Sequence, residues 1–357
     1  MKYVVDAGTQ PVITLKWKSR LLAMCFLLVL LVIMIAVAVS IGSTKIPLST
    51  TFDIILSKIP FLSIEQTWEG PIETAIIDIR MPRALLAGIT GAALAVAGAT
   101  YQGLFRNPLA DPYLIGVSQG AALGAVIGFL IPAVGSGWSL NIVPVFAFIG
   151  GLGAVFLVYS LGKVSKTLPM TTLILAGVAL GAFLSAITSY LLITSGESLH
   201  GISSWLMGGF SSPKWNQVWI ILPLSTIGML FICLYGRPLN VMQFDEEQAQ
   251  QLGINVERTK RILLVAATLI TAAAVSFGGV IGFVGIIIPH AVRLVWGPDF
   301  RFLLPLSMVC GSIFLIMADL LARTVMSPRE IPLGIVTAFF GAPFFLFLLR
   351  RRKRAIF

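Results

Sequence analysis

The chain has 357 residues, of which 57% are hydrophobic and only 11% are charged, and its formal net charge is +10. A soluble globular domain has roughly 45–50% apolar residues, so this composition excludes an ordinary soluble protein. Apolar runs of about 20 residues, the length that an α-helix needs to cross a bilayer, recur along the chain and do not alternate as membrane β-strands would. The sequence therefore predicts an all-α polytopic membrane protein.

About ten apolar segments are predicted to cross the membrane, at 21–41, 84–104, 114–131, 142–161, 169–193, 215–235, 262–277, 280–296, 302–322 and 332–349. The first is longer than the apolar part of a signal peptide, and no clear cleavage site follows it, so we expect it to be retained. An even number of spans places both chain ends on one side of the membrane. Basic residues before the first span and in the run RRRKR at 350–354 indicate that this side is the cytoplasm.

These assignments divide the chain into a cytoplasmic N-terminal segment (1–20), a transmembrane domain (21–349) and a basic cytoplasmic tail (350–357). The basic residues lie at span ends, so the positive-inside rule explains the net charge and we expect no nucleic-acid partner. The three cysteines lie in apolar runs, and the two histidines, His200 and His290, lie in separate regions. Neither pattern indicates a disulfide, a metal site or a cofactor site.

Several features are expected between the spans. The segments STTFDIILSKI (49–59) and LHGISSWLMGGF (199–210) predict short helices at the outer membrane surface. Two X-Pro pairs, Asn107-Pro108 and Asp111-Pro112, predict a tight turn between the second and third spans. Small residues crowd the segments 88–99, 116–128 and 175–186, which favours close helix packing, although glycine-lined spans can also border a wide cavity.

A polar loop at 236–261, GRPLNVMQFDEEQAQQLGINVERTKR, interrupts the apolar segments. Within it, FDEEQAQQLG predicts a short helix with an acidic start and a glycine stop, and NVERTKR predicts a second short helical turn. A solvated connector is the simpler interpretation. A surface for a soluble partner explains better why so many of the few charges gather here.

Two arginine pairs open spans in the same pattern. Arg80-x-x-Arg83-x-Leu-Leu begins the second span and Arg258-x-x-Arg261-x-Leu-Leu begins the seventh, which runs in the opposite direction in this layout. This arrangement fits an inverted repeat, but the match is too short to establish one.

The segment RMPRALLAGITGAALAVAGATYQGLFRNPLADPYLIGVSQGAALGA (80–125) resembles the signature region of FecCD-type permeases. Three further blocks agree in order and spacing: EEQAQQLGINVERTKR (246–261), GFVGIIIPHAVRLVWGPDFRFLLP (282–305) and REIPLGIVTAFFGAPFFLFLL (329–349). The resemblance implies a type II ABC importer permease in the cell inner (cytoplasmic) membrane, with the transmembrane domain as the permease domain. It also implies three protein partners: a cytoplasmic ATPase, an extracytoplasmic substrate-binding protein, and a second permease copy or a paralogue.

The resemblance assigns two sets of residues. Loop 236–261 would dock in a cleft of the ATPase, with Asp245, Glu246 and Glu247 meeting basic groups and with Leu252 and Gly253 supplying the apolar contact and the turn.

On the outer face, Arg80, Arg83 and Arg323 would receive acidic residues of the binding protein. The alternative for Arg80 and Arg83 is anchoring at the membrane interface. For Arg323 the alternative is an i,i+4 ion pair with Asp319.

The resembled family carries ferric siderophores, haem and cobalamin. We expect a ferric siderophore or a similar bulky metal chelate here, with haem or cobalamin as the alternative. The sequence has no GxxxxGK[ST] phosphate-binding loop, so the chain is expected to be no enzyme and to depend on a separate ATPase. An ion-coupled secondary transporter is less favoured, because no acidic residue lies near the middle of a predicted span. An intramembrane enzyme is also less favoured, because the sequence contains no recognisable set of catalytic residues.

Overall fold

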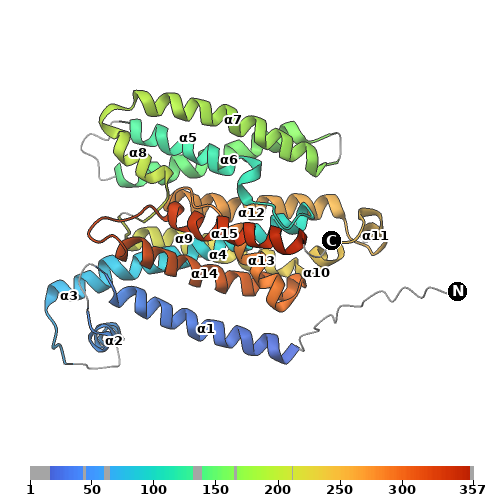
Figure 1. Ribbon diagram of the computed structural model, residues 1–357. Coiled ribbons are helices and arrows are strands. Elements are labelled where there is room, and N and C mark those ends of the chain that lie inside the picture. The colour runs from blue at the N-terminus through green and yellow to red at the C-terminus, as the bar shows by residue number, and fades with distance from the viewer. Residues whose placement is uncertain are drawn as a thin grey trace.

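The protein is described here by a computed structural model that covers residues 17–42, 46–59, 65–131, 139–164, 167–210 and 212–353. Each predicted span coincides with a helix, and the helices run side by side (Figure 1). Among the described residues, seven helical segments are long and apolar enough to cross a membrane: α1 (Trp17–Ser40), the segment Gly70–Leu104 that ends in α4 (Met81–Leu104), α6 (Ser139–Gly162), α7 (Met170–Thr194), α9 (Trp215–Leu234), α12 (Val256–Gly278) and α14 (Phe300–Thr324). Three further helices with shorter apolar stretches complete the set, which confirms the predicted fold class: α5 (Val117–Leu130), α13 (Val284–Trp296) and α15 (Leu333–Lys353).

The connecting helices gather at the two ends of the bundle (Figure 1). One end carries the start of α1, the end of α15, and the short helices α10 (Gly236–Val241) and α11 (Glu246–Gln251). The other end carries α2 (Leu48–Ser57), α3 (Gly70–Thr74) and α8 (Leu199–Leu206), and of these α2 and α8 were predicted. The positive-inside rule makes the first end cytoplasmic. Most of the predicted segment 1–20 and the last four residues of the tail 350–357 lie outside the described residues.

The second span begins further out than predicted. Instead of starting at residue 84, helical structure runs from Gly70, through a π-helical turn at Ala75–Arg80, into α4. Pro82 has no N–H, so the carbonyl of Ile77 has no partner five residues later along the helix. The indole Nε1 of Trp215 donates to this carbonyl at 2.9 Å instead. A contact from a distant helix thus supports the extension.

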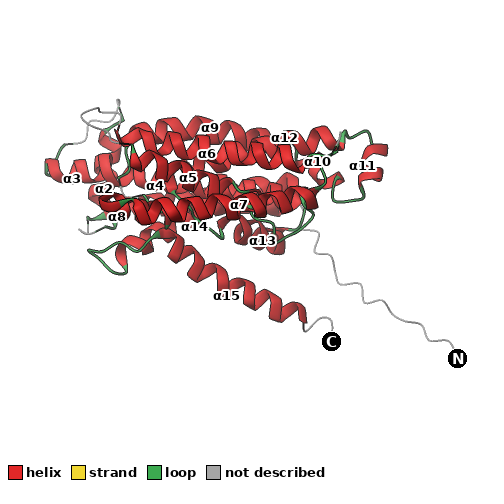
Figure 2. Cartoon of the chain, turned by 90° about the horizontal axis from the view of Figure 1, so that it is seen from above, coloured by secondary structure: helices red, strands yellow, loops and turns green. Residues whose placement is uncertain are grey.

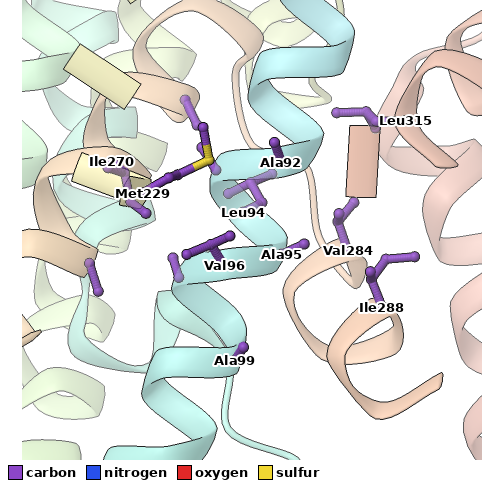
Figure 3. Close-up of a cluster of buried hydrophobic side chains, with 14 of the residues drawn as sticks. Ala92, Leu94, Ala95, Val96, Ala99, Met229, Ile270, Val284, Ile288 and Leu315 are labelled. Atoms are coloured by element: carbon purple, nitrogen blue, oxygen red, sulfur yellow. The ribbon is translucent and has the colours of Figure 1, made fainter. Parts of the chain in front are cut away.

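Helix α4 lies at the centre of the bundle. In its most apolar stretch 89% of the residues are buried, against 22% in α1 and in α7. Figure 3 shows small and apolar side chains of α4, such as Ala92 and Val96, surrounded by side chains from α9, α12, α13 and α14. By contrast, α15 leaves the bundle at an angle (Figure 2), and its Phe339 is 73% exposed.

Glycine allows α4 to approach its neighbours at backbone distance. A Cβ placed on Gly98 would lie 1.9 Å from the carbonyl oxygen of Gly285 in α13. Between α5 and α6, a Cβ on Gly120 would lie 2.3 Å from the carbonyl oxygen of Gly150. In lipid, a helix gains no hydrophobic free energy when it exchanges lipid contacts for helix contacts. Helices therefore associate through close packing of this kind. The glycines of α4 and α5 therefore serve packing.

We expect Gly98→Ala to destabilise the fold by about 1–3 kcal/mol or more, because the added methyl group meets fixed backbone. Gly153→Ala in α6 is the matched control, since a Cβ at Gly153 would meet nothing within 4 Å. Thermal unfolding of the two purified variants in detergent measures the difference. An unchanged melting temperature for Gly98→Ala would contradict the backbone contact between α4 and α13.

Candidate functional site

Loop 236–261 at the cytoplasmic end is folded and capped. Asp245 is the N-cap of α11, and its side chain accepts a hydrogen bond from the backbone N–H of Glu246 at 2.8 Å. After α11 the chain turns at Gly253, whose φ of +83° lies in the left-handed region that glycine tolerates best. The predicted capped helix is therefore present. The helical turn predicted at NVERTKR is also present, and it runs directly into the next span: the side chain of Asn255 accepts a hydrogen bond from the backbone N–H of Arg258, and these residues form the first turns of α12.

The loop is fastened to the end of α4. The guanidinium of Arg106, just beyond α4, donates from Nε to the carbonyl of Met242 at 2.9 Å. The side-chain amide of Gln243 donates to the carbonyl of Gly103 at 3.1 Å. These bonds join the segment between α10 and α11 to the central helix.

A second set of bonds joins α10 to the start of α14. Asn240 donates to the carboxylate of Asp299 at 2.6 Å and accepts from the backbone N–H of Phe300 at 2.8 Å. Arg20 of α1 lies 3.8 Å from the same carboxylate. Partial burial acts to raise the pKa of Asp299, but hydrogen bonds from Arg301 and Asn240 outweigh it and lower this pKa to about 2. Asp299 therefore stays ionised at neutral pH and links α1, α10 and α14.

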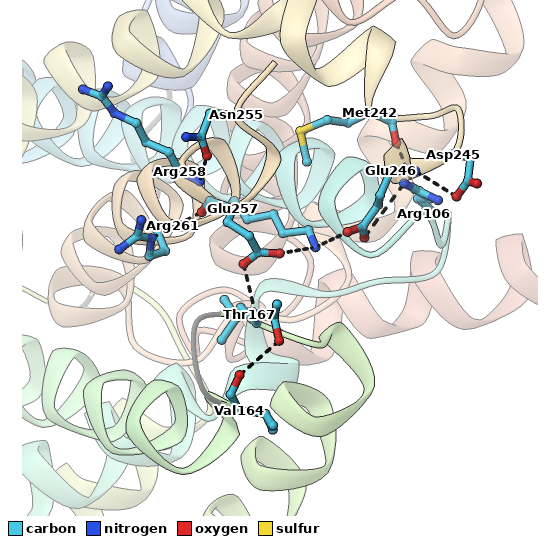
Figure 4. Close-up of polar contacts among 12 residues, drawn as sticks. Arg106, Val164, Thr167, Met242, Asp245, Glu246, Asn255, Glu257, Arg258 and Arg261 are labelled. Atoms are coloured by element: carbon cyan, nitrogen blue, oxygen red, sulfur yellow. Dashed lines mark hydrogen bonds and ion pairs between the residues drawn. The ribbon is translucent and has the colours of Figure 1, made fainter. Parts of the chain in front are cut away.

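A buried lysine joins α11 to α12 by pairing with Glu246 and Glu257, which Figure 4 labels. The side chain of Lys260 is only 4% exposed, and its ammonium lies 2.8 Å from Glu246 and 3.1 Å from Glu257. The other carboxylate oxygen of Glu257 accepts from the backbone N–H of Leu168, just before α7, at 3.0 Å. A buried ammonium is stable only when its charge is compensated, so these carboxylates hold the loop in one position.

The residues expected to meet an ATPase thus divide into two groups. Asp245 and Glu246 hold the loop together, whereas Glu247 is exposed and has no ion pair within the described part of the chain. Leu252 is 68% exposed, as an apolar contact residue would be, and so is Phe244 at 62%. Phe244 is not among the residues expected from the sequence to meet an ATPase. Its position as an aromatic residue in a polar loop was the signal that could have revealed it.

We expect Glu246→Gln to loosen the loop, because Lys260 then keeps only Glu257 as a charged partner. Because Glu246 is partly exposed, we expect the free energy of local opening to fall by about 1 kcal/mol, which corresponds to roughly five-fold more frequent opening. Hydrogen–deuterium exchange of residues 245–253 measures this opening. Glu247→Gln removes the neighbouring charge and should leave exchange unchanged; equal effects of the two substitutions would contradict the assigned roles.

At the outer end, Arg83 occupies the centre of a buried ion cluster. Its Nε lies 3.1 Å from both carboxylate oxygens of Asp319 in α14. Its two terminal nitrogens form a bidentate pair with Glu330 at 2.8 and 2.9 Å. The Arg83 side chain is 11% exposed, whereas that of Glu330 is 48% exposed. Glu330 is therefore the solvent-exposed partner of the buried Arg83.

The other two arginines also bind internally. Arg80 donates to the carbonyls of Val39 and Ser40, at the end of α1, at 3.1 and 2.8 Å. Arg323 donates to the carbonyl of Ala38, and its Nε lies 3.6 Å from Asp319. The i,i+4 pair considered for Arg323 is thus present. Interfacial anchoring does not describe Arg80 or Arg83, because both residues are buried.

The structure brings together the three arginines expected on this face, but it adds two residues that sequence analysis missed. Glu330 closes the cluster, and its neighbour Arg329 is exposed, with no ion pair among the described residues. Both lie in the segment SPRE between α14 and α15. An adjacent Arg-Glu pair in an outer loop was the available signal.

Known proteins share this architecture. The profile of the FecCD transport family matches residues 29–351. The cobalamin import system permease protein BtuC of Halobacterium salinarum is 42% identical over 324 residues, which cover 88% of this chain and 86% of that protein. The hemin transport system permease protein HmuU of Yersinia pestis is 36% identical over 341 residues, covering 92% and 95%.

A solved structure, described as an inward-facing conformation of a metal-chelate type ABC transporter, matches with a TM-score of 0.78 at 30% identity, covering 92% of this chain and 99% of that one. The chain therefore belongs to the FecCD transport family and is a multi-pass permease subunit of an ABC importer in the inner (cytoplasmic) membrane.

Proposed function

We propose that this permease carries a bulky metal chelate inward as one of two membrane subunits, driven by a separate ATPase that docks on loop 236–261. The cargo would be delivered by a binding protein at the outer arginine cluster. The observation that carries the proposal is the loop itself, because it presents exposed side chains on one surface while hydrogen bonds and ion pairs fasten its other surface to the bundle.

The contacts of the loop support a coupling role. Loop residues bond to the end of α4 through Gly103, to the start of α14 through Asp299, and to the start of α7 through Leu168. A displacement of α11 by a moving partner would therefore act on several spans together. The exposed Phe244 and Leu252 would fill an apolar cleft of the ATPase, and Glu247 would pair with a basic group at its edge.

The substrate class follows from the relatives. Those named above are permeases for cobalamin and hemin, and both ligands are large metal chelates. Cobalamin is the first cargo to test, because several further relatives are named vitamin B12 import system permease proteins. A ferric siderophore, the cargo expected from the sequence, belongs to the same class.

The second membrane subunit would be another copy of this chain or a paralogue. Helix α15 leaves the bundle at an angle (Figure 2), and its Ile335 and Phe339 are 53% and 73% exposed. A partner subunit would cover part of this apolar surface, and the pathway would lie between the two subunits.

The energy source provides the direct test of this proposal. Liposomes that contain the permease alone should take up no cobalamin, hemin or ferric siderophore under any imposed pH or sodium gradient. Adding the cognate ATPase, the binding protein and ATP should start uptake of one of these cargoes. An ATPase whose phosphate-loop lysine is replaced should stop uptake, since that lysine holds the transferring phosphate. Gradient-driven uptake by the permease alone would overturn the proposal.

Docking of the binding protein would use carboxylate exchange. We propose that Arg80, Arg83 and Arg323 form the base of the docking surface, with the exposed Arg329 as the first contact for an acidic side chain. Glu330 occupies the bidentate position on Arg83 that a carboxylate of the partner would take. Docking would therefore release Glu330 to solvent and connect the partner to α4 and α14.

We expect Glu330→Gln to strengthen docking several-fold, because a neutral amide competes less well for Arg83. Arg329→Gln should slow association, most strongly at low salt, because exposed charges chiefly set the encounter rate. Both are measured as association and dissociation rates of the immobilised permease with purified binding protein over a range of ionic strength. If neither substitution changes a rate at any salt concentration, this cluster is structural only.

A further inference from the structure

An apolar groove runs along the outside of the bundle between α9 and α12. It has a volume of about 780 Å³ and is lined by Leu224, Ile227 and Phe231 of α9 and by Val265 and Leu269 of α12. Two arginines, Arg258 and Arg261, close one end of the groove; they are among the last residues of loop 236–261 and lie in the first turns of α12. The groove therefore combines an apolar length with a cationic end.

These two arginines have no anionic partner in the described part of the chain. Arg261 donates from Nε to the backbone carbonyl of Glu257, at 3.3 Å, and no carboxylate of a described residue lies within 4.0 Å of either guanidinium. The carboxylate of Glu257 is held by Lys260 and by the N–H of Leu168 instead.

The matching arginine pair at the start of α4 has internal partners. Arg80 and Arg83 open α4 in the same sequence pattern, and there the structure supplies carboxylates and carbonyls for both. For Arg258 and Arg261 no described side chain supplies a carboxylate. Both arginines also lie in the first two turns of α12, where the helix dipole is positive and already disfavours cations. An external anion at this position would pair with both exposed guanidinium groups and offset their repulsion from the helix dipole.

The length of the groove indicates what kind of anion fits. From Arg258 to Leu269 the groove follows α12 for eleven residues, or roughly 16 Å at the usual helical rise. This is about half of the roughly 30 Å hydrocarbon thickness of a bilayer, and therefore the depth of one leaflet. A soluble partner would reach the arginines but not the apolar walls that lie deeper.

We propose that this groove binds an anionic phospholipid of the cytoplasmic leaflet, whose phosphate lies between Arg258 and Arg261 and whose acyl chain lies against α9 and α12. The bound lipid neutralises the start of α12, the helix that leads out of loop 236–261. It would thereby stabilise the position from which Lys260 holds the loop.

The test uses the full-length permease in detergent, titrated with phosphatidylglycerol or with phosphatidylcholine and followed by native mass spectrometry. Arg258→Gln/Arg261→Gln should weaken phosphatidylglycerol binding by roughly ten- to thirty-fold, on the scale of about ten-fold or less for each basic residue near a membrane surface. Binding of phosphatidylcholine should not change. Lys214→Gln/Arg329→Gln removes two exposed charges at the opposite end and should leave both affinities unchanged.

The apolar part of the site is tested separately. Val265→Trp fills the groove at a residue that is 57% exposed, and it should reduce phosphatidylglycerol binding while both arginines remain. Ile220→Trp places the same side chain on α9 outside the groove, at a residue that is 53% exposed, and should have no effect.

Four results would overturn the proposal. The first is unchanged phosphatidylglycerol binding in Arg258→Gln/Arg261→Gln, and the second is unchanged binding in Val265→Trp. The third is full competition by glycerol phosphate or inorganic phosphate, which would show a headgroup-sized anion site without an acyl chain. The fourth is loss of the bound lipid when the purified ATPase is added, which would assign the arginines to that interface instead.

Discussion

The backbone contacts of α4 limit where the other helices can lie. In a bilayer, contacts between helices are no more apolar than contacts with lipid, so helices associate through close van der Waals packing. The glycines of α4 remove the side chains that would keep neighbouring backbones apart, as Gly98 does against Gly285 and Gly91 does against Gly311. Because a backbone cannot move aside as a side chain can, these contacts fix the spacing of α4 from α13 and α14.

The same helix connects the two clusters of polar residues. Arg83 lies in the first turn of α4 at the outer end, and the carbonyl of Gly103, to which loop 236–261 is bonded, lies near its last residue. With 24 residues, α4 is roughly 36 Å long. A stiff helix buried along this length would transmit movement between the outer cluster and loop 236–261. Binding-protein docking and ATPase movement would thus act on the same element from opposite ends.

The charged residues of this chain differ in how their charges are compensated. Arg83 and Lys260 are buried and each lies between two carboxylates, as the low dielectric of a protein interior requires. Glu247 and Arg329 are exposed without an ion pair among the described residues, and Arg258 and Arg261 stand beside an apolar groove. The compensated charges fix the structure, and the uncompensated ones mark the surfaces where ATPase, binding protein and lipid are proposed to bind.

The sequence by itself determined the membrane spans, because the thickness of the bilayer imposes a length of apolar residues that a single pass along the chain reveals. It also determined features whose partners are close in sequence, such as the capped helix that starts at Asp245 and the i,i+4 pair of Asp319 with Arg323. The four blocks of family resemblance indicated a permease, because a family signature is carried by the order of residues along the chain.

Only the tertiary structure decided which charged residues are buried and which are free. Arg83 and Glu330 are 247 positions apart, and Lys260 meets Glu246 only because α11 folds back on α12. The outward extension of α4 likewise depends on Trp215, which lies 138 positions from the carbonyl that it supports. The sequence shows which residues are charged. Whether a charge is compensated depends on which opposite charges the packing of distant segments places within a few ångströms of it. The order of residues along the chain does not contain those distances.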